Sequence, residues 1–207
     1  MTFGYFVGRV IRGIAWGVCH VVFPYRVIGK ENKPRRGQKQ RLIMCCNHLS
    51  YIDPAFLLCS QPVPVRFMAK NELFQNKFIG FCISHLFGAF PVHRGKGDVA
   101  AIDMGEGLIK EGDIVGIFPE GTRSKTGELG RFKTGASLII ARTGATMLPV
   151  ALVTKDQKVR AFRMTTVVYG KPMTPEELHL TGDKPDLRYA TRMLSAVIAD
   201  LIEEGRK

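Results

Sequence analysis

The sequence contains no Cys-x-x-Cys pair, no internal repeat and no low-complexity tract. Without repeats, a solenoid or a fibrous chain is excluded. The five cysteines are an odd number in apolar surroundings, so they do not indicate a disulfide framework; we expect reduced, buried thiols in a cytosol-facing protein. With 45% hydrophobic and 23% charged residues among 207, the chain is not disordered and has enough residues for one domain with a sizeable core.

Metal-ligating residues are also sparse. Cys45, Cys46 and His48 lie close together in the sequence and raise the alternative of a zinc site. Adjacent cysteines on a strand point to opposite faces, however, and no second pair of ligands follows them. We therefore expect no metal and no redox cofactor.

Acidic residues are few, since 18 Asp and Glu stand against 30 Lys and Arg, a formal net charge of +12. This excess favours anionic partners: nucleic acid, phospholipid headgroups or a phosphorylated substrate. The sequence holds no aromatic-bearing RNA motif, helix-turn-helix or zinc finger, so we expect no nucleic acid. Residues 1–40 carry eight basic residues and only one acidic residue, Glu31, so more than half of the excess charge lies there.

The first 21 residues form an amphipathic pattern on a helical wheel. The apolar side consists of Phe3, Phe6, Val7, Val10, Ile11, Ile14, Val18 and Val21. Two arginines within the stretch argue against a spanning helix, and the absence of a small-residue cleavage site argues against a signal peptide. Four glycines make the helix weak in water, so it needs a surface to fold against. We expect residues 1–40 to be a membrane-interface helix followed by a basic linker; a helix docked on its own domain is the alternative.

From residue 41 onward, short apolar runs alternate with helical patterns. The predicted strands are residues 41–46, 63–69, 88–92, 114–118, 146–153 and 163–169. The predicted helices are residues 54–60, 72–86, 99–111, 135–143 and 185–204. This alternation predicts one α/β domain over residues 41–207, with a mixed, mostly parallel sheet covered by helices on both faces.

Polar residues follow several of the predicted strands, at the sheet edge where open α/β sheets bind ligands. Asn47 and His48 follow the first strand, Lys70 the second, Arg94 the third, and Glu120 to Arg123 the fourth. Ordinary charged loops would also place polar residues there. The combination of one histidine with several cations favours a functional site.

His48 and Asp53 are five positions apart, so on a continuous helix their side chains would diverge. A turn brings them together if Asp53 caps a helix that starts with Pro54. A carboxylate on the imidazole would fix its tautomer and stabilise the imidazolium formed when His48 takes a proton. In the alternative interpretation, Asp53 only caps the helix.

A nucleophile to accompany this base is missing, because the sequence holds no Gly-x-Ser-x-Gly elbow and no comparably spaced cysteine. The base is therefore expected to activate a hydroxyl of a bound substrate. In residues 118–124, a glycine permits close backbone approach, a threonine can donate a hydrogen bond and an arginine can bind phosphate with two hydrogen bonds. This turn is interpreted as an anion cradle, with a plain polar turn as the alternative.

Four blocks occur in order along the chain, and they resemble those of the glycerophospholipid acyltransferases, most closely the lysophosphatidate acyltransferase branch. The blocks are Asn47-His-Leu-Ser-Tyr-Ile-Asp-Pro54, Phe90-Pro-Val-His-Arg-Gly95, Phe118-Pro-Glu-Gly-Thr-Arg-Ser124 and Leu148-Pro-Val-Ala151. The resemblance covers roughly residues 41–170.

The resemblance implies that His48, assisted by Asp53, removes the proton from the sn-2 hydroxyl of lysophosphatidate. That oxygen would attack an acyl thioester, on coenzyme A or acyl carrier protein, and give phosphatidate without an acyl-enzyme. The residues expected to bind or organise the glycerol phosphate are Lys70, Arg94, Glu120, Gly121, Thr122 and Arg123. Glu120 is acidic, so it is expected to orient the arginines.

The sequence is compatible with other activities as well. The acceptor could be glycerol 3-phosphate, another lysophospholipid or an amino-lipid, because pocket shape sets the acceptor. The chain could also be a lipid-binding relative that has lost catalysis. The resemblance further implies membrane association at the cytoplasmic face, with phospholipid biosynthesis as the role.

Overall fold

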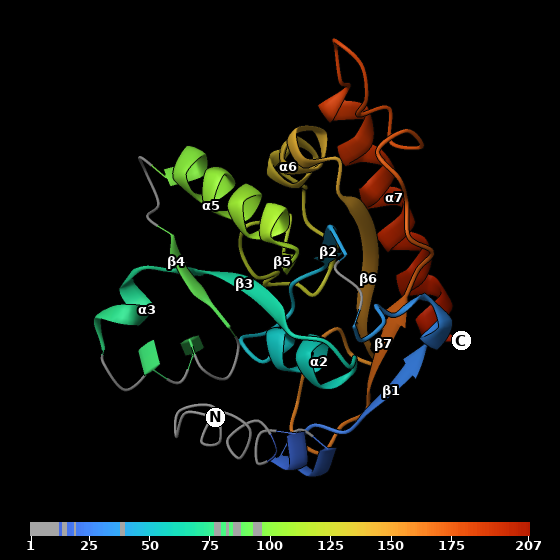
Figure 1. Cartoon of the computed structure of the whole chain (residues 1–207). Helices are drawn as coiled ribbons and strands as arrows, with labels where there is room; N and C mark the ends of the chain where they lie inside the picture. The colour runs from blue at the N-terminus through green and yellow to red at the C-terminus, as the bar shows by residue number, and fades with distance from the viewer. Residues whose placement is uncertain are drawn as a thin grey trace.

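A seven-stranded sheet forms the centre of the computed structural model, which describes residues 13, 16–18, 20–37, 40–76, 80, 81, 83, 84, 88–92 and 97–207. The strand order is β1-β7-β6-β2-β5-β3-β4 (Figure 1). The strands are β1 (Tyr25–Ile28), β2 (Leu42–Cys46), β3 (Val65–Lys70), β4 (Phe90–Val92), β5 (Ile114–Ile117), β6 (Thr146–Thr154) and β7 (Thr165–Tyr169). Neighbouring strands are parallel except β6 and β7. The predicted mostly parallel α/β sheet is confirmed.

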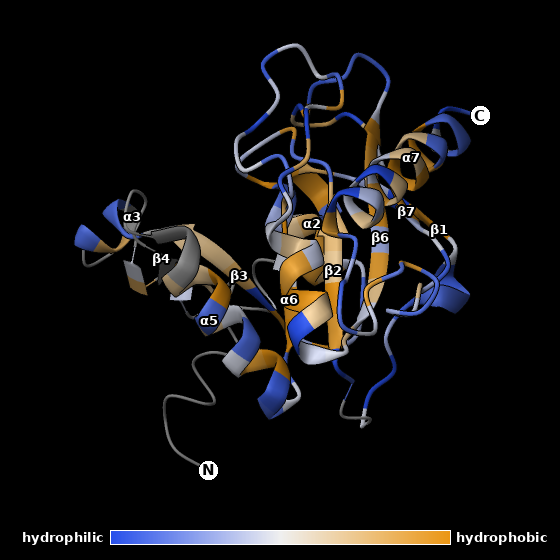
Figure 2. Ribbon diagram, turned by 90° about the horizontal axis from the view of Figure 1, so that it is seen from above, coloured by the Kyte–Doolittle hydropathy of each residue, from blue (hydrophilic) through white to orange (hydrophobic). Residues whose placement is uncertain are grey.

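Helices cover both faces of this sheet. On one face, α5 (Gly97–Glu111), α6 (Gly135–Thr143) and α7 (Leu187–Arg206) pack on a core that includes Ile43 and Cys45 of β2. On the other face, α2 (Asp53–Cys59) packs on a core that includes Met44 and Cys46. Figure 2 shows the apolar residues on the central strands and the polar residues along the outer loops. Alternate residues of β2 therefore serve opposite cores, as expected for a central strand.

The last helix, predicted over residues 185–204, is amphipathic. Its buried stripe includes Ala190, Leu194, Ile198 and Leu201, and these residues pack in the same core as α6. Asp186 caps the helix by accepting a hydrogen bond from the backbone N–H of Tyr189 at 2.8 Å. Burial of this stripe attaches the C-terminal segment to the sheet.

The sheet also takes in residues that the sequence analysis assigned to the N-terminal linker. Strand β1 pairs in parallel with β7, with Tyr25 opposite Thr165, and the short 3-10 helix η1 (Lys30–Asn32) follows it. A four-residue strand shows too little periodicity to be found from sequence, and its partner lies far along the chain. Residues 16–18 and 20–22 are helical, while the rest of the predicted amphipathic helix falls largely outside the described residues.

The predicted single helix over residues 72–86 is wrong. Helix α3 (Glu72–Gln75) ends at Asn76, whose φ of −81° and ψ of 113° are extended. Residues 80, 81, 83 and 84 are helical again. The apolar periodicity of the stretch is real, but a backbone break that the periodicity does not encode divides it.

Within the part of the chain that the structure describes, no helix is both long and apolar enough to cross a membrane.

Gly116 of β5 leaves room for the ring of Phe67, which lies beside the ring of Phe118. A Cβ on Gly116 would lie 2.3 Å from the Phe67 ring, closer than any real contact. We expect Gly116→Ala to destabilise the protein by about 1–3 kcal/mol through overpacking. Urea unfolding measures this. The matched control is Gly107→Ala in α5, where a Cβ would meet nothing within 4 Å, so a gain of about 0.5–1 kcal/mol is expected. Equal effects of the two substitutions would contradict this packing account.

Candidate active site

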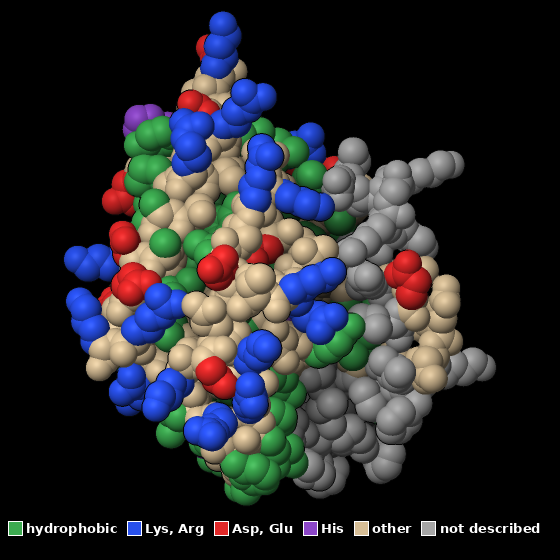
Figure 3. Space-filling view, turned by 180° about the vertical axis from the view of Figure 1, so that it is seen from behind, with side chains coloured by type: hydrophobic (Ala, Val, Ile, Leu, Met, Phe, Trp, Pro, Cys, Tyr) green, Lys and Arg blue, Asp and Glu red, His purple; other side chains and the backbone are tan. Residues whose placement is uncertain are grey.

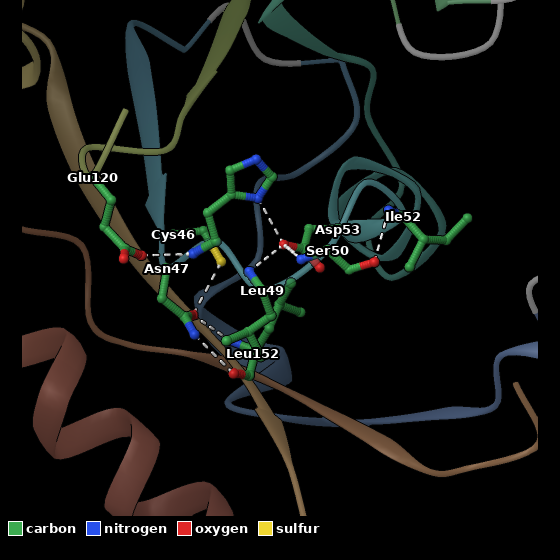
Figure 4. Close-up of polar contacts among 9 residues, drawn as sticks. Cys46, Asn47, Leu49, Ser50, Ile52, Asp53, Glu120 and Leu152 are labelled. Carbon is green, nitrogen blue, oxygen red and sulfur yellow. Dashed lines mark hydrogen bonds and ion pairs between the residues drawn. The ribbon is translucent and has the colours of Figure 1, made fainter. Parts of the chain in front are cut away.

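His48 and Asp53 form a pair at the C-terminal end of β2. The Nδ1 atom of His48 lies 2.8 Å from Oδ2 of Asp53. The same Oδ2 accepts hydrogen bonds from the backbone N–H groups of Leu49 at 2.6 Å and Ser50 at 2.7 Å (Figure 4). The predicted proximity of the two side chains is confirmed, and the intervening loop folds around one carboxylate oxygen.

The predicted helix cap is wrong in one respect. The N-cap of α2 is Ile52, with no side-chain cap, and Asp53 is the first helical residue, followed by Pro54. The carboxylate of Asp53 turns back to the preceding loop instead of capping the helix. Because the loop donates two backbone hydrogen bonds to it, the carboxylate shapes the segment that carries His48.

Asp53 is fully buried, whereas the side chain of His48 is 18% exposed. Burial raises the pKa of Asp53, and the hydrogen bonds from His48, Ser50 and Leu49 oppose this rise. Its second oxygen, Oδ1, has no hydrogen-bond partner among the described residues. With Nδ1 turned to Asp53, the opposite ring nitrogen, Nε2, is the atom available to a substrate.

The imidazole plane is fixed by aromatic stacking. The rings of His48 and Phe118 are stacked, with centroids 4.1 Å apart and planes 19° apart. Phe67 lies beside Phe118 with centroids 5.8 Å apart. These contacts and the Asp53 bond leave the histidine little rotational freedom, which suits a base that must meet a hydroxyl in one direction.

Glu120 connects the loop after β5 to His48. Its Oε1 accepts the backbone N–H of His48 at 2.8 Å and its Oε2 accepts that of Gly130 at 2.9 Å. The backbone N–H of Ser124 donates in turn to the carbonyl of His48 at 2.8 Å. Burial raises the pKa of Glu120, against the effect of the two backbone hydrogen bonds.

These bonds show a further role for Glu120, whose predicted action on the arginines stays a prediction because Arg94 lies outside the described residues. Both of its carboxylate oxygens accept backbone N–H groups, and in the described part of the chain no ion pair joins it to an arginine. A Cβ on Gly130 would lie 2.6 Å from Oε2, so the glycine is needed for the approach. Glu120 therefore holds two loops together beside the histidine.

Basic side chains surround the turn after β5. Gly121 has a φ of +73°, and a Cβ there would lie 3.2 Å from Nζ of Lys133, so the lysine lies along the turn. The guanidinium carbon of Arg123 lies 3.4 Å from the centroid of the Tyr51 ring. Sequence reasoning did not assign a role to Lys133 or Tyr51. The spacing of residues in the sequence does not indicate that Arg123 contacts Tyr51.

A cavity of about 330 Å³ adjoins this turn. It is lined by Glu120, Thr122, Arg123, Ser124, Thr126, Glu128, Leu129, Gly130 and Arg131. The cavity therefore includes Thr122 and Arg123, two of the residues predicted to bind an anion. Its position next to His48 follows from the two bonds that Glu120 and Ser124 make to that residue.

The remaining predicted residues have different outcomes. Lys70 is the last residue of β3, and β3 and β5 are parallel, so its backbone lies at the same sheet edge as His48. Arg94 lies outside the described residues. Asn47 is buried, and its amide exchanges two hydrogen bonds with the backbone of Leu152 in β6, so its role is to join two strands.

The cysteines beside the site are buried thiols. Burial raises the pKa of Cys45 to about 12 and raises that of Cys46 as well, so both stay protonated near neutral pH. They face opposite cores. Among the described residues, no group of three or more His, Cys, Asp and Glu side chains is arranged to hold a metal ion.

Comparisons with known proteins agree with the fold and the motifs. The family model described as Acyltransferase matches residues 24–153, more than half of the chain. A Bacillus subtilis 1-acyl-sn-glycerol-3-phosphate acyltransferase is 32% identical over 196 residues, 93% of this chain and 92% of that protein. A chloroplastic Arabidopsis thaliana enzyme of the same name, LPAT1, is 31% identical over 73% of this chain and 41% of its own length.

A solved structure is similar in fold. It is the 1-acyl-sn-glycerophosphate acyltransferase PlsC from Thermotoga maritima, with a TM-score of 0.71 at 22% identity. The match covers 97% of this chain and 80% of that one. At this identity the match supports the architecture of the sheet and helices.

Asp53→Asn tests the carboxylate without removing its shape. The amide oxygen can take the place of Oδ2 and still accept from Leu49, Ser50 and Nδ1 of His48, but a neutral amide stabilises the imidazolium much less than a carboxylate does. We expect turnover to fall by a factor of roughly 10² to 10⁴. Because burial raises the pKa of Asp53, loss of the charge should leave the melting temperature unchanged or higher at neutral pH.

Steady-state kinetics and calorimetry on the same preparation measure both effects. The matched control is Asp183→Asn, at an exposed loop position far along the chain, where neither quantity should change. Full turnover in Asp53→Asn would contradict the assigned role of the carboxylate.

Proposed function

The chain belongs to the Acyltransferase family, and from this we propose that it moves a fatty acyl chain from an acyl thioester to the sn-2 hydroxyl of lysophosphatidate. The product is phosphatidate, in phospholipid biosynthesis. The observation that carries the proposal is the His48–Asp53 pair, joined by Glu120 to a basic turn with a cavity. A base without a protein nucleophile, next to an anion cradle, suits attack by a hydroxyl of a phosphorylated acceptor.

The proposed reaction starts when Nε2 of His48 takes the proton of the sn-2 hydroxyl. The oxygen forms a bond to the thioester carbonyl carbon, and the C–S bond then breaks. The leaving thiolate takes the proton back from His48, which regenerates the neutral imidazole. Asp53 stabilises the transient imidazolium because its carboxylate lies 2.8 Å from Nδ1. These steps require neither a metal nor a redox cofactor.

The acceptor phosphate is proposed to bind at the turn after β5. Arg123 and Thr122 line the cavity there, and the ammonium of Lys133 lies along Gly121. A guanidinium binds phosphate with two parallel hydrogen bonds, and an ammonium adds a second positive charge. Lys70 and Arg94 are proposed as further phosphate contacts, on the resemblance of their blocks to the family.

The partners follow from the substrates. Lysophosphatidate resides in a membrane, so we propose that the protein works at the phospholipid surface on the cytoplasmic face. The acyl donor is proposed to be acyl-coenzyme A or acyl carrier protein. The net charge of +12 favours both an anionic surface and a phosphorylated acceptor.

The direct test measures free thiol released from long-chain acyl-coenzyme A with and without lysophosphatidate, and identifies the lipid product by mass. Release that depends on lysophosphatidate and gives phosphatidate is expected. His48→Ala should lower this rate by a factor of roughly 10² to 10⁴. His179→Ala, which removes an exposed histidine stacked on Tyr189, is the matched control and should keep full activity.

The other outcomes are also informative. Release with glycerol 3-phosphate or another lysophospholipid, but not with lysophosphatidate, would replace the proposed acceptor. If acyl-coenzyme A is inactive, acyl carrier protein is tested with the same acceptors. No release with either donor would contradict the enzymatic proposal and favour a lipid-binding protein.

Arg123→Ala tests the phosphate cradle. Loss of a charge-assisted hydrogen bond should raise KM for lysophosphatidate by about 10- to 100-fold, with a smaller change in kcat. Arg123→Lys should recover part of the loss, because it keeps the charge but not the planar fork. Arg192→Ala, at an exposed position of α7, is the control. An unchanged acceptor KM in Arg123→Ala would move the phosphate site elsewhere.

A further inference from the structure

Five large apolar side chains are exposed in two segments that lie far apart in the sequence. They are Trp16 (53% exposed), Val18 (49%), Val21 (71%), Phe162 (72%) and Met164 (54%), and we call them the apolar rim. The backbone N–H of Phe162 donates to the carbonyl of Val22 at 2.6 Å, and that of Thr165 to Pro24 at 2.9 Å. The two segments therefore lie side by side, at the bottom of Figure 1.

The apolar rim lies at the same sheet edge as the active site. Strand β6 is parallel to β2, so the loop 155–164 that follows β6 leaves the sheet at the end where His48 follows β2. Tyr25 at the start of β1 is opposite Thr165, so the residues before it lie at this edge as well. The loop also contacts the segment that lines the cavity. A Cβ on Gly127, which lies between the lining residues Thr126 and Glu128, would be 2.2 Å from Cβ of Gln157.

The loop is held in a conformation that leaves the side chain of Phe162 in solvent. Phe162 has a φ of +60°, a conformation that bulky residues rarely adopt, and its side chain is nevertheless directed to solvent. Strained residues persist when the surrounding structure holds them, here through the bonds from Phe162 to Val22 and from Arg163 to Arg160. The neighbouring helical residues contact β1 through His20, whose ring centroid lies 4.7 Å from that of Tyr25, with the two rings tilted.

The charge of the loop indicates what the apolar rim contacts. Lys155, Lys158, Arg160 and Arg163 are all exposed. Within the loop, only Asp156 opposes them, and it pairs with Arg160 at 3.0 Å. In Figure 3, Lys and Arg are spread over the rear face and apolar side chains gather at its lower edge. Exposed aromatic and aliphatic side chains can insert into a bilayer, and basic residues beside them are attracted to anionic headgroups.

We propose that loop 155–164 is a membrane-docking element, which inserts Phe162 and Met164 into an anionic bilayer and holds the active-site edge against it. The loop acts together with residues 16–22, whose exposed Val18 and Val21 belong to the same rim. The inference rests on the proposed function for the identity of the membrane-resident acceptor. Binding itself is independent of catalysis and is measured without it.

The first experiment measures flotation with vesicles of phosphatidylcholine alone or mixed with phosphatidylglycerol in equal parts. Wild-type protein should float with the mixed vesicles. Phe162→Asn combined with Met164→Gln should weaken binding at least about tenfold, since two apolar side chains no longer insert. Lys155→Glu combined with Lys158→Glu should also weaken binding to the mixed vesicles about tenfold or more. Met104→Gln, at an exposed apolar residue of α5, is the matched control and should bind as wild type.

A spectroscopic measurement keeps the test valid if a loop variant folds poorly. The chain has one tryptophan, Trp16, so Trp16→Phe combined with Phe162→Trp moves the fluorophore into the loop. Mixed vesicles should shift the emission of the introduced indole to the blue, and lipids with a brominated chain should quench it. An unshifted, unquenched emission while the protein floats would overturn docking by the loop.

Three further outcomes separate this inference from the alternatives. Equal flotation of the Phe162→Asn, Met164→Gln variant and wild type would overturn it, whatever the enzymatic assays show. If sedimentation without lipid shows a dimer for the wild type and a monomer for that variant, the apolar rim is an interface between two copies. This result would also overturn the membrane proposal. Loss of activity toward acceptor in vesicles, with activity toward detergent-dispersed acceptor kept, would support it.

Discussion

The buried carboxylate of Asp53 is the group on which the site depends. A buried charge is costly unless several donors surround it, and one oxygen of Asp53 accepts the N–H groups of Leu49 and Ser50 and faces Nδ1 of His48. The loop between β2 and α2 adopts the conformation that brings these donors together. The same arrangement that offsets the burial of the carboxylate therefore fixes the tautomer and the direction of the imidazole.

The central place of β2 in the sheet explains how this loop is joined to the turn after β5. Asn47 connects the end of β2 to β6 on one side, while Glu120 and Ser124 bind the backbone of His48 from the segment after β5 on the other. Parallel neighbours bring all three strand ends to one edge. His48 and the turn after β5 are thus positioned by hydrogen bonds to the main chain. The exposed apolar and basic residues of loop 155–164 lie at this edge as well.

The parts of the fold that sequence predicted are those with strong local signals. Strand β2 and helix α6 stand out as apolar runs ended by Asn47 and Gly144. A turn before Pro54 predicted that His48 meets Asp53, although the carboxylate holds the loop instead of capping the helix. The missed parts depend on distant contacts. Strand β1 exists because β7 pairs with it, and the cation–π contact of Arg123 exists because the loop of Tyr51 folds beneath it. The break at Asn76 and the bridging role of Glu120 likewise follow from tertiary structure.

The central claim is that Asp53 holds His48 with its proton on Nδ1 and leaves Nε2 free to act as the base. Nitrogen-15 NMR of protein labelled at histidine measures this directly, with His48→Ala used to assign the signal. The account predicts that, in the neutral imidazole, the Nδ1 resonance is that of a protonated nitrogen and the Nε2 resonance that of an unprotonated one. The opposite pattern, with the proton on Nε2, would contradict it.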